Sequence, residues 1–187
     1  MIFRLFLAAT LIALAGCATT PPRYVVPRAE PGDRVGIGFR TVEVRRVTLP
    51  SYASLSEIFV EGEDGAVVEA KSAIWADEPD RAITLELTRA LGQITSAKVA
   101  SEPWPFDAFP QARVEVRIED MLARRDGQFV LSGQYFVAAL DGSSRDRAKL
   151  FDITAPIAAD GGATAIAKAR GETVQALARE IARSGLR

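Results

Sequence analysis

The sequence predicts an α+β fold, a two-layer body in which two amphipathic helices pack on one face of a largely antiparallel, mixed sheet. Short runs rich in β-branched and aromatic residues alternate with turn formers, which is typical of strands. Two longer segments instead repeat apolar residues every three or four positions, as helices do. Each predicted helix has a single apolar stripe, so the pair can cover only one face of a sheet. A chain of 187 residues fits one domain with a substantial core.

The first predicted strands lie in residues 35–47, 54–60 and 66–70. Pro50 and the Gly-containing stretch 62–65 separate them, and both are turn signals. These runs therefore predict a group of short strands at the start of the folded body.

A helix is predicted next, because apolar residues recur at helical spacing after residue 77. Asp77 can cap this helix, and Pro79 is tolerated in its first turn. The expected stripe consists of Ile83, Leu87, Leu91 and Ile94.

Three consecutive strands follow in residues 112–122, 128–140 and 148–157. The first has one apolar and one charged face, which indicates a sheet with one side in the core and one in water. Tight turns at 125–127 and 141–144 favour an antiparallel meander. The apolar face of the first strand carries Val114, Val116 and Ile118.

The chain closes with a helix predicted over residues 163–183. Gly185 lies where a C-terminal stop is expected, whereas Gly171 lies inside the helix and costs ~1 kcal/mol relative to alanine. The stripe of this helix consists of Val174, Leu177, Ala178 and Ile181.

Composition argues against enzymatic chemistry. The chain has no histidine, so Ser-His-Asp and Cys-His mechanisms are excluded and the commonest zinc ligand is missing. No Ser-Lys motif, nucleophile elbow or phosphate-binding Gly-rich loop is present. We therefore expect no catalytic residue, no metal site and no cofactor. The 23 basic and 24 acidic side chains form no basic run, so nucleic acid is not an expected partner.

The N-terminus has the pattern of a lipoprotein signal peptide over residues 1–16. Its apolar run, 5–15, is about 11 residues long, whereas a membrane-spanning helix needs ~20. The run ends in Leu14, Ala15, Gly16 and Cys17, which resemble the lipobox of bacterial lipoproteins. Because Cys17 is the only cysteine, we expect it to be acylated and to become the first residue of the mature chain.

Residues 17–33 read as a lipid-anchored, Pro-rich tether ahead of a single domain at 34–187. An extended Pro-rich chain rises ~3.1 Å per residue, so this tether could lift the body roughly 50 Å from the bilayer. Residues 24–26 could instead pack on the domain as a first, irregular strand, and the sequence leaves both alternatives open. Ala18 follows the cysteine where Asp would signal inner-membrane retention, so resemblance to lipoprotein sorting signals favours the outer membrane.

The order of these parts resembles the ABC-type transport auxiliary lipoproteins of the PqiC/YmbA type, over nearly the whole mature chain. The most specific match is Trp75-Ala76, just ahead of the first helix. The other matching stretches are 14–17, 24–27, 42–52, 73–77 with the helix through Leu91, 114–118, 130–136 and the closing Ala-rich helix.

The resemblance implies a non-enzymatic, outer-membrane-tethered periplasmic subunit. Such subunits serve lipid transporters built from an inner-membrane permease and proteins with mammalian-cell-entry (MCE) domains, and they support envelope integrity. The implied partners are the bilayer, through acylated Cys17, and an MCE-domain subunit with its permease. Self-association into a homo-oligomer stays open.

Four aromatic residues are candidate partner contacts. Trp104, Phe106 and Phe109 fall within six residues among prolines and could present an apolar patch, or could fold back over the sheet edge. Trp75 could line a docking surface, although an aromatic residue at a strand-to-helix junction more often fills the core.

Two other functions are compatible with the sequence. One is a structural or assembly lipoprotein that braces or plugs an outer-membrane protein. The other is a lipid-anchored hydrolase that uses carboxylates alone.

Overall fold

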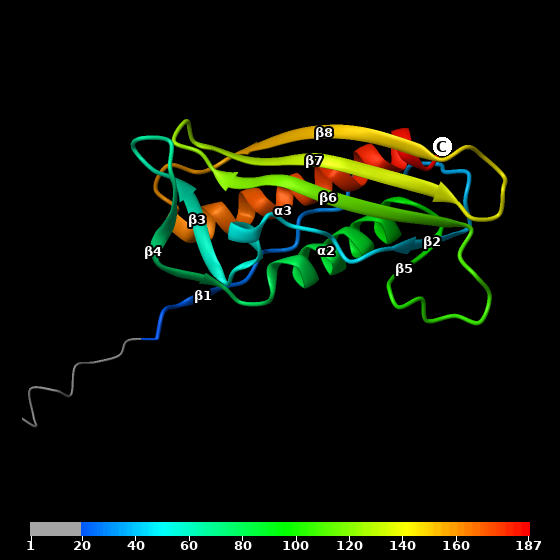
Figure 1. Ribbon diagram of the computed structural model, residues 1–187, viewed down its shortest axis with the longest axis horizontal. Coiled ribbons are helices and arrows are strands. Elements are labelled where there is room, and N and C mark those ends of the chain that lie inside the picture. Colours follow the sequence, from blue (N-terminus) through cyan, green and yellow to red (C-terminus); the bar gives the residue numbers. More distant parts are fainter. Residues whose placement is uncertain (1–19) are drawn as a thin grey trace, which may run out of the picture.

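The computed structural model describes residues 20–187, in which two long helices cover one face of a mixed eight-stranded sheet (Figure 1). This confirms the predicted α+β fold. The predicted signal peptide 1–16 and Cys17 lie outside the described residues.

The strands are β1 Arg23–Tyr24, β2 Thr41–Val44, β3 Glu57–Glu61, β4 Val67–Trp75, β5 Lys98–Ser101, β6 Ala112–Ala123, β7 Gln128–Ala139 and β8 Arg147–Pro156. The helices are α2 Pro79–Ile94 and α3 Gly162–Glu180, with a 3-10 turn at Ser51–Ser54 and a π-helical turn at Ile181–Gly185.

Strand β6 organises the sheet. One edge pairs with β7 along its whole length, and β7 pairs with β8, so the predicted antiparallel meander is confirmed. The other edge of β6 is shared by two parallel neighbours, β2 near its start and β3 at its end. Strand β5 extends the sheet beyond β2, while β4 and then β1 extend it beyond β3. The sheet is therefore mixed, with its longest ladders antiparallel.

The first predicted strand, 35–47, is shorter than expected, because only Thr41–Val44 forms a regular ladder. The residues on either side bond to other parts of the molecule. Val35 N donates to the carbonyl of Ile94, and Gly38 N donates to the carbonyl of Leu186, so this stretch joins both helix ends instead of a sheet.

Helix α2 begins differently from the prediction, because Glu78 occupies the N-cap position and makes no side-chain capping bond. Asp77, the predicted cap, accepts a hydrogen bond from Glu78 N at 2.9 Å and pairs with Arg81 one turn later. Pro79 is the first helical residue and has no N–H to satisfy, which reduces the need for a capping side chain.

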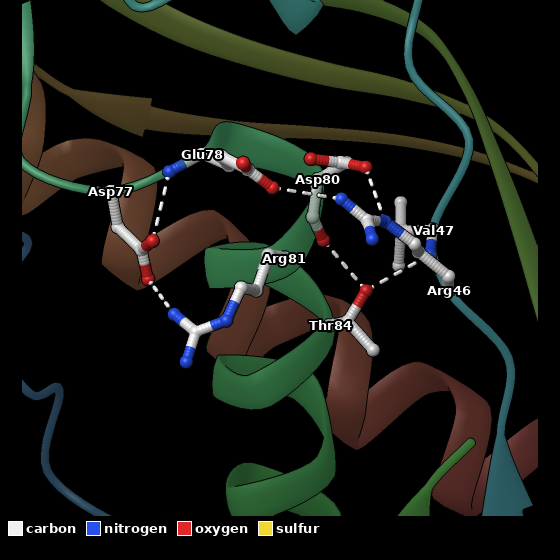
Figure 2. Close-up of polar contacts among 7 residues, drawn as sticks. All are labelled: Arg46, Val47, Asp77, Glu78, Asp80, Arg81 and Thr84. Carbon is white, nitrogen blue, oxygen red and sulfur yellow. Dashed lines mark hydrogen bonds and ion pairs between the residues drawn. The ribbon is translucent and has the colours of Figure 1, made fainter. Parts of the chain in front are cut away.

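The start of α2 is joined to the chain that follows β2 (Figure 2). Arg46 donates from Nε to Asp80 at 2.5 Å and from Nη2 to Glu78 at 3.0 Å. Thr84 Oγ1 accepts the N–H of Val47 at 2.9 Å and donates to the Asp80 carbonyl at 2.6 Å. This network satisfies polar groups at the helix start and sets its position beside the sheet.

The core lies between the sheet and the two helices, as the predicted stripes require. All four stripe residues of α2 are fully buried, and those of the closing helix are at most 1% exposed. The apolar face of β6 meets them, while Glu115 and Arg117 on its other face are accessible to solvent. Among residues 20–187, no helix has the length and apolarity needed to cross a membrane.

Residues 23–33, called here the N-terminal segment, lie against the folded body. Tyr24 pairs with Trp75 as part of β1, so of the two alternatives left open for this region the structure shows a short first strand. Val26 and Pro27 then pass over Gly171 of α3, where a Cβ atom would lie 2.9 Å from Val26 Cγ1 and 3.1 Å from the Pro27 carbonyl oxygen. The glycine that weakens the predicted helix thus makes room for this crossing.

Candidate functional site: an aromatic loop

The aromatic residues singled out in the sequence lie in the loop between β5 and β6, called here the aromatic loop (residues 102–111). The loop lies at the end of the molecule opposite β1 (Figure 1). Glu102 N donates to the carbonyl of Val44 at 2.9 Å where the loop begins. At its other end, the Gln111 side chain accepts from Arg40 N at 2.6 Å, and Gln111 N donates to Thr41 Oγ1 at 2.9 Å. Both ends of the loop are therefore fixed to the start or end of β2.

The interior of the aromatic loop is organised around Trp104. Its indole Nε1 donates to the carbonyl of Ala108 at 2.7 Å, which closes the loop on itself. The Phe106 ring meets Trp104 edge to face with 5.0 Å between ring centroids, and Lys98 Nζ lies 4.6 Å from the Phe106 centroid. These contacts favour one loop conformation before any partner binds.

Phe109 is the residue that this loop presents to solvent. Its side chain is 91% exposed, against 42% for Phe106, and Trp104 is half-buried within the loop. An exposed phenyl ring on a preorganised loop is suited to insertion into an apolar pocket of a partner protein. The arrangement offers recognition by apolar contact.

Trp75 does not belong to this loop. It ends β4 beside β1, where only 4% of its surface is exposed, and so it is a core residue. The Arg170 guanidinium carbon lies 4.5 Å from the Trp75 ring centroid. The four predicted contact residues therefore divide between opposite ends of the molecule.

The buried pair of Arg170 and Glu86 is a feature that the sequence analysis missed. Arg170 is 1% exposed and donates from Nη2 to Glu86 Oε1 at 2.5 Å. Burial raises the pKa of the Glu86 carboxyl and lowers the pKa of the Arg170 guanidinium, because each charge has lost most of its contact with water. Arg170 lies four residues before Val174 on the same helical stripe, and that spacing is the signal that could have identified it.

Within residues 20–187 no group of acidic or cysteine side chains is arranged to hold a metal ion. The geometry combines a folded body, an aromatic loop at one end, and an N-terminal segment whose first residues form β1 at the other end (Figure 1).

The family model described as "ABC-type transport auxiliary lipoprotein component" matches residues 24–182. The chain belongs to this family. The match begins at Tyr24, so the N-terminal segment of this auxiliary lipoprotein is part of the family pattern. The family description is that of a transport component, which indicates a non-enzymatic role, association with an ABC-type transporter and association with a membrane.

Two solved structures share the fold of the auxiliary lipoprotein. A Xanthomonas campestris protein of the DUF330 family is 14% identical with a TM-score of 0.68, and the match covers 88% of this chain and 94% of that one. An uncharacterized protein is 20% identical with a TM-score of 0.57, and the match covers 85% of this chain and 98% of that one. No curated protein matches the chain.

Proposed function

We propose that this auxiliary lipoprotein is an outer-membrane-anchored, periplasmic subunit of an MCE-type, ABC-linked lipid transport system. In this role it supports envelope integrity by docking on the transporter. The observation that carries the proposal is the exposure of Phe109 on a preorganised loop, and this loop lies at the end of the molecule opposite β1 (Figure 1).

The anchor in this proposal is the acylated Cys17. Arg23, where β1 begins, is only six residues after Cys17 in the sequence. A fully extended chain covers at most about 3.6 Å per residue, so these residues span no more than about 22 Å. The folded body would then be held closer to the bilayer than the roughly 50 Å that a free tether of 17–33 would allow.

A short connection also favours one orientation of the body. With β1 held near the outer membrane, the aromatic loop at the opposite end is directed into the periplasm. A transporter that rises from the inner membrane would approach that end. The expected partner at the loop is therefore an MCE-domain subunit, which connects to the permease.

In this proposal the folded domain acts by docking on a partner and not by catalysis. The chain contains no histidine and the aromatic loop no paired acid and base, whereas exposed aromatic anchors dominate the binding energy of many protein interfaces. Removing the Phe109 side chain should therefore weaken docking without unfolding the protein.

Affinity capture of the acylated chain after crosslinking in cells tests this function. Recovery of an MCE-domain protein is the expected result. Recovery of an outer-membrane protein with no MCE-domain protein would contradict the proposal and would favour the alternative of a bracing or plugging lipoprotein. Intact-mass analysis of the captured chain reports the acylation of Cys17 in the same experiment.

A further inference from the structure

A second surface feature lies where the N-terminal segment leaves the body. It is a groove of about 240 Å³ between the N-terminal segment, the start of α2 and α3, called here the N-terminal groove. Its walls include Tyr24, Val25, Arg28, Trp75, Leu85 and Arg89.

The charges in this groove leave two arginines available to a ligand. Its carboxylates are already paired, Asp77 with Arg81 and Glu86 with Arg170. Arg28 and Arg89 are both exposed, and in the described part of the chain neither forms an ion pair. Two unpaired guanidinium groups on one groove favour a ligand that carries phosphate oxygens.

Buried polar atoms beneath the groove remain unsatisfied. Arg170 Nε and Glu86 Oε2 have no hydrogen-bond partner, although both residues line the groove. Buried polar groups are rarely left without partners. The free N–H of Arg170 is a donor suited to a ligand that brings an oxygen acceptor, whereas the Glu86 oxygen is an acceptor and adds nothing to the binding of an anion.

Apolar side chains stand beside the cations. Val25 is 75% exposed and Leu85 is 37% exposed, and both line the groove. Aliphatic side chains flanked by arginines are typical of protein surfaces that contact the headgroup region of a bilayer.

We propose that the N-terminal groove binds the phosphate headgroups of the bilayer to which the chain is tethered. The inference rests on the proposed function, because acylation of Cys17 is what holds Arg23, the residue before the groove residue Tyr24, within about 22 Å of that surface. Arg28 and Arg89 contact lipid phosphates, while Val25 and Leu85 insert among the headgroups. Tethering raises the local concentration of lipid, so weak individual contacts suffice.

Fluorescence quenching in vesicles tests the proposal with the full acylated chain. A fluorophore is attached at Val25→Cys, and the protein is reconstituted into vesicles of phosphatidylethanolamine and phosphatidylglycerol that contain a headgroup nitroxide lipid. Leu150→Cys, on an exposed position of β8, is the matched control. We expect quenching at position 25 at least about fivefold stronger than at position 150, since nitroxide quenching requires near contact. The charge reversal R28E/R89E should reduce it by about half or more, because each arginine near an anionic surface adds attraction.

Equal quenching at positions 25 and 150, or quenching at 25 that the charge reversal leaves unchanged, would overturn the headgroup contact. Arg28 and Arg89 are exposed, so the reversed variant should fold, and its circular dichroism spectrum verifies this. Measuring the intact mass of the protein distinguishes failure of this inference from failure of the proposed function. An acylated chain without quenching contradicts only headgroup binding by the groove. An unmodified Cys17 contradicts both the lipid anchor and headgroup binding.

Discussion

Arg170 lies directly on Trp75, with its guanidinium carbon 4.5 Å from the ring centroid, and donates to Glu86 at 2.5 Å. This contact joins α3 to the end of β4 and to α2 at one point beneath the N-terminal segment. A buried ion pair adds little net stability over an apolar pair, but it is costly to break on one side only.

Replacing Arg170 with methionine should therefore destabilise the fold. The substitution leaves Glu86 buried without its cation, and we expect the free energy of unfolding to fall by about 3 kcal/mol. Urea unfolding followed by tryptophan fluorescence measures this change. The double variant R170M/E86L should recover most of the loss, and equal stability of R170M and the unmodified chain would contradict the role assigned to the pair.

Replacing Gly171 with leucine should displace the N-terminal segment. The Cβ atom alone would overlap Val26 Cγ1 at 2.9 Å and press on the Pro27 carbonyl oxygen at 3.1 Å, and the rest of the leucine side chain adds to this overlap. We expect trypsin to cleave after Arg28 several-fold faster, because the segment is released from α3. Gly92→Ala is the control, since a Cβ there has only Val99 Cβ at 4.0 Å, and unchanged cleavage in the leucine variant would refute the packing described for Val26.

Replacing Gly133 with alanine should destabilise the central ladder between β6 and β7. Gly133 has a φ of 153° beside the irregularity at Ile118–Asp120, and a Cβ would lie 2.1 Å from the Arg117 carbonyl oxygen. We expect a loss of about 3 kcal/mol in urea unfolding, from backbone strain and steric overlap together. Gly127→Ala shares the positive φ but has open space, so its cost should stay near about 1 kcal/mol, and equal costs would contradict the assignment.

Alkaline pH should destabilise the fold through Tyr135. Burial raises the pKa of its phenol to about 12, while in the unfolded chain it returns to about 10. The raised value means that stability is fully present below pH ~10 and is lost as the pH rises toward ~12. Stability measured between pH 9 and about 11 should therefore fall more steeply for the unmodified chain than for Tyr135→Phe, and identical slopes would contradict the burial of the phenol.

Much of the fold follows from local patterns in the sequence. The stripe of Ile83, Leu87, Leu91 and Ile94 and the alternation of Val114, Val116 and Ile118 predict elements whose burial the structure confirms. These patterns are informative because each element packs only one of its faces on the core. The spacing of its apolar residues therefore shows both the type of element and the face that is buried.

Other features depend on contacts between distant segments and leave no periodic signal. Strand β5 has four residues and exists because β2 lies beside it. The difference between Trp104, which holds the aromatic loop together, and Phe109, which faces solvent, depends on a hydrogen bond to Ala108 and not on spacing. The burial of Arg170 likewise depends on Glu86, 84 residues away.

Site-specific photocrosslinking in cells tests the central claim most directly. A photoreactive residue at position 109 should capture an MCE-domain protein, whereas the same residue at position 150, which replaces a leucine that is 72% exposed on β8, should not. Phe109→Ser, introduced into the chain that carries an affinity tag, should reduce co-purification of that partner at least about tenfold, the cost of losing one aromatic anchor. Capture of no transporter protein from position 109, or equal capture from both positions, would contradict docking through the aromatic loop.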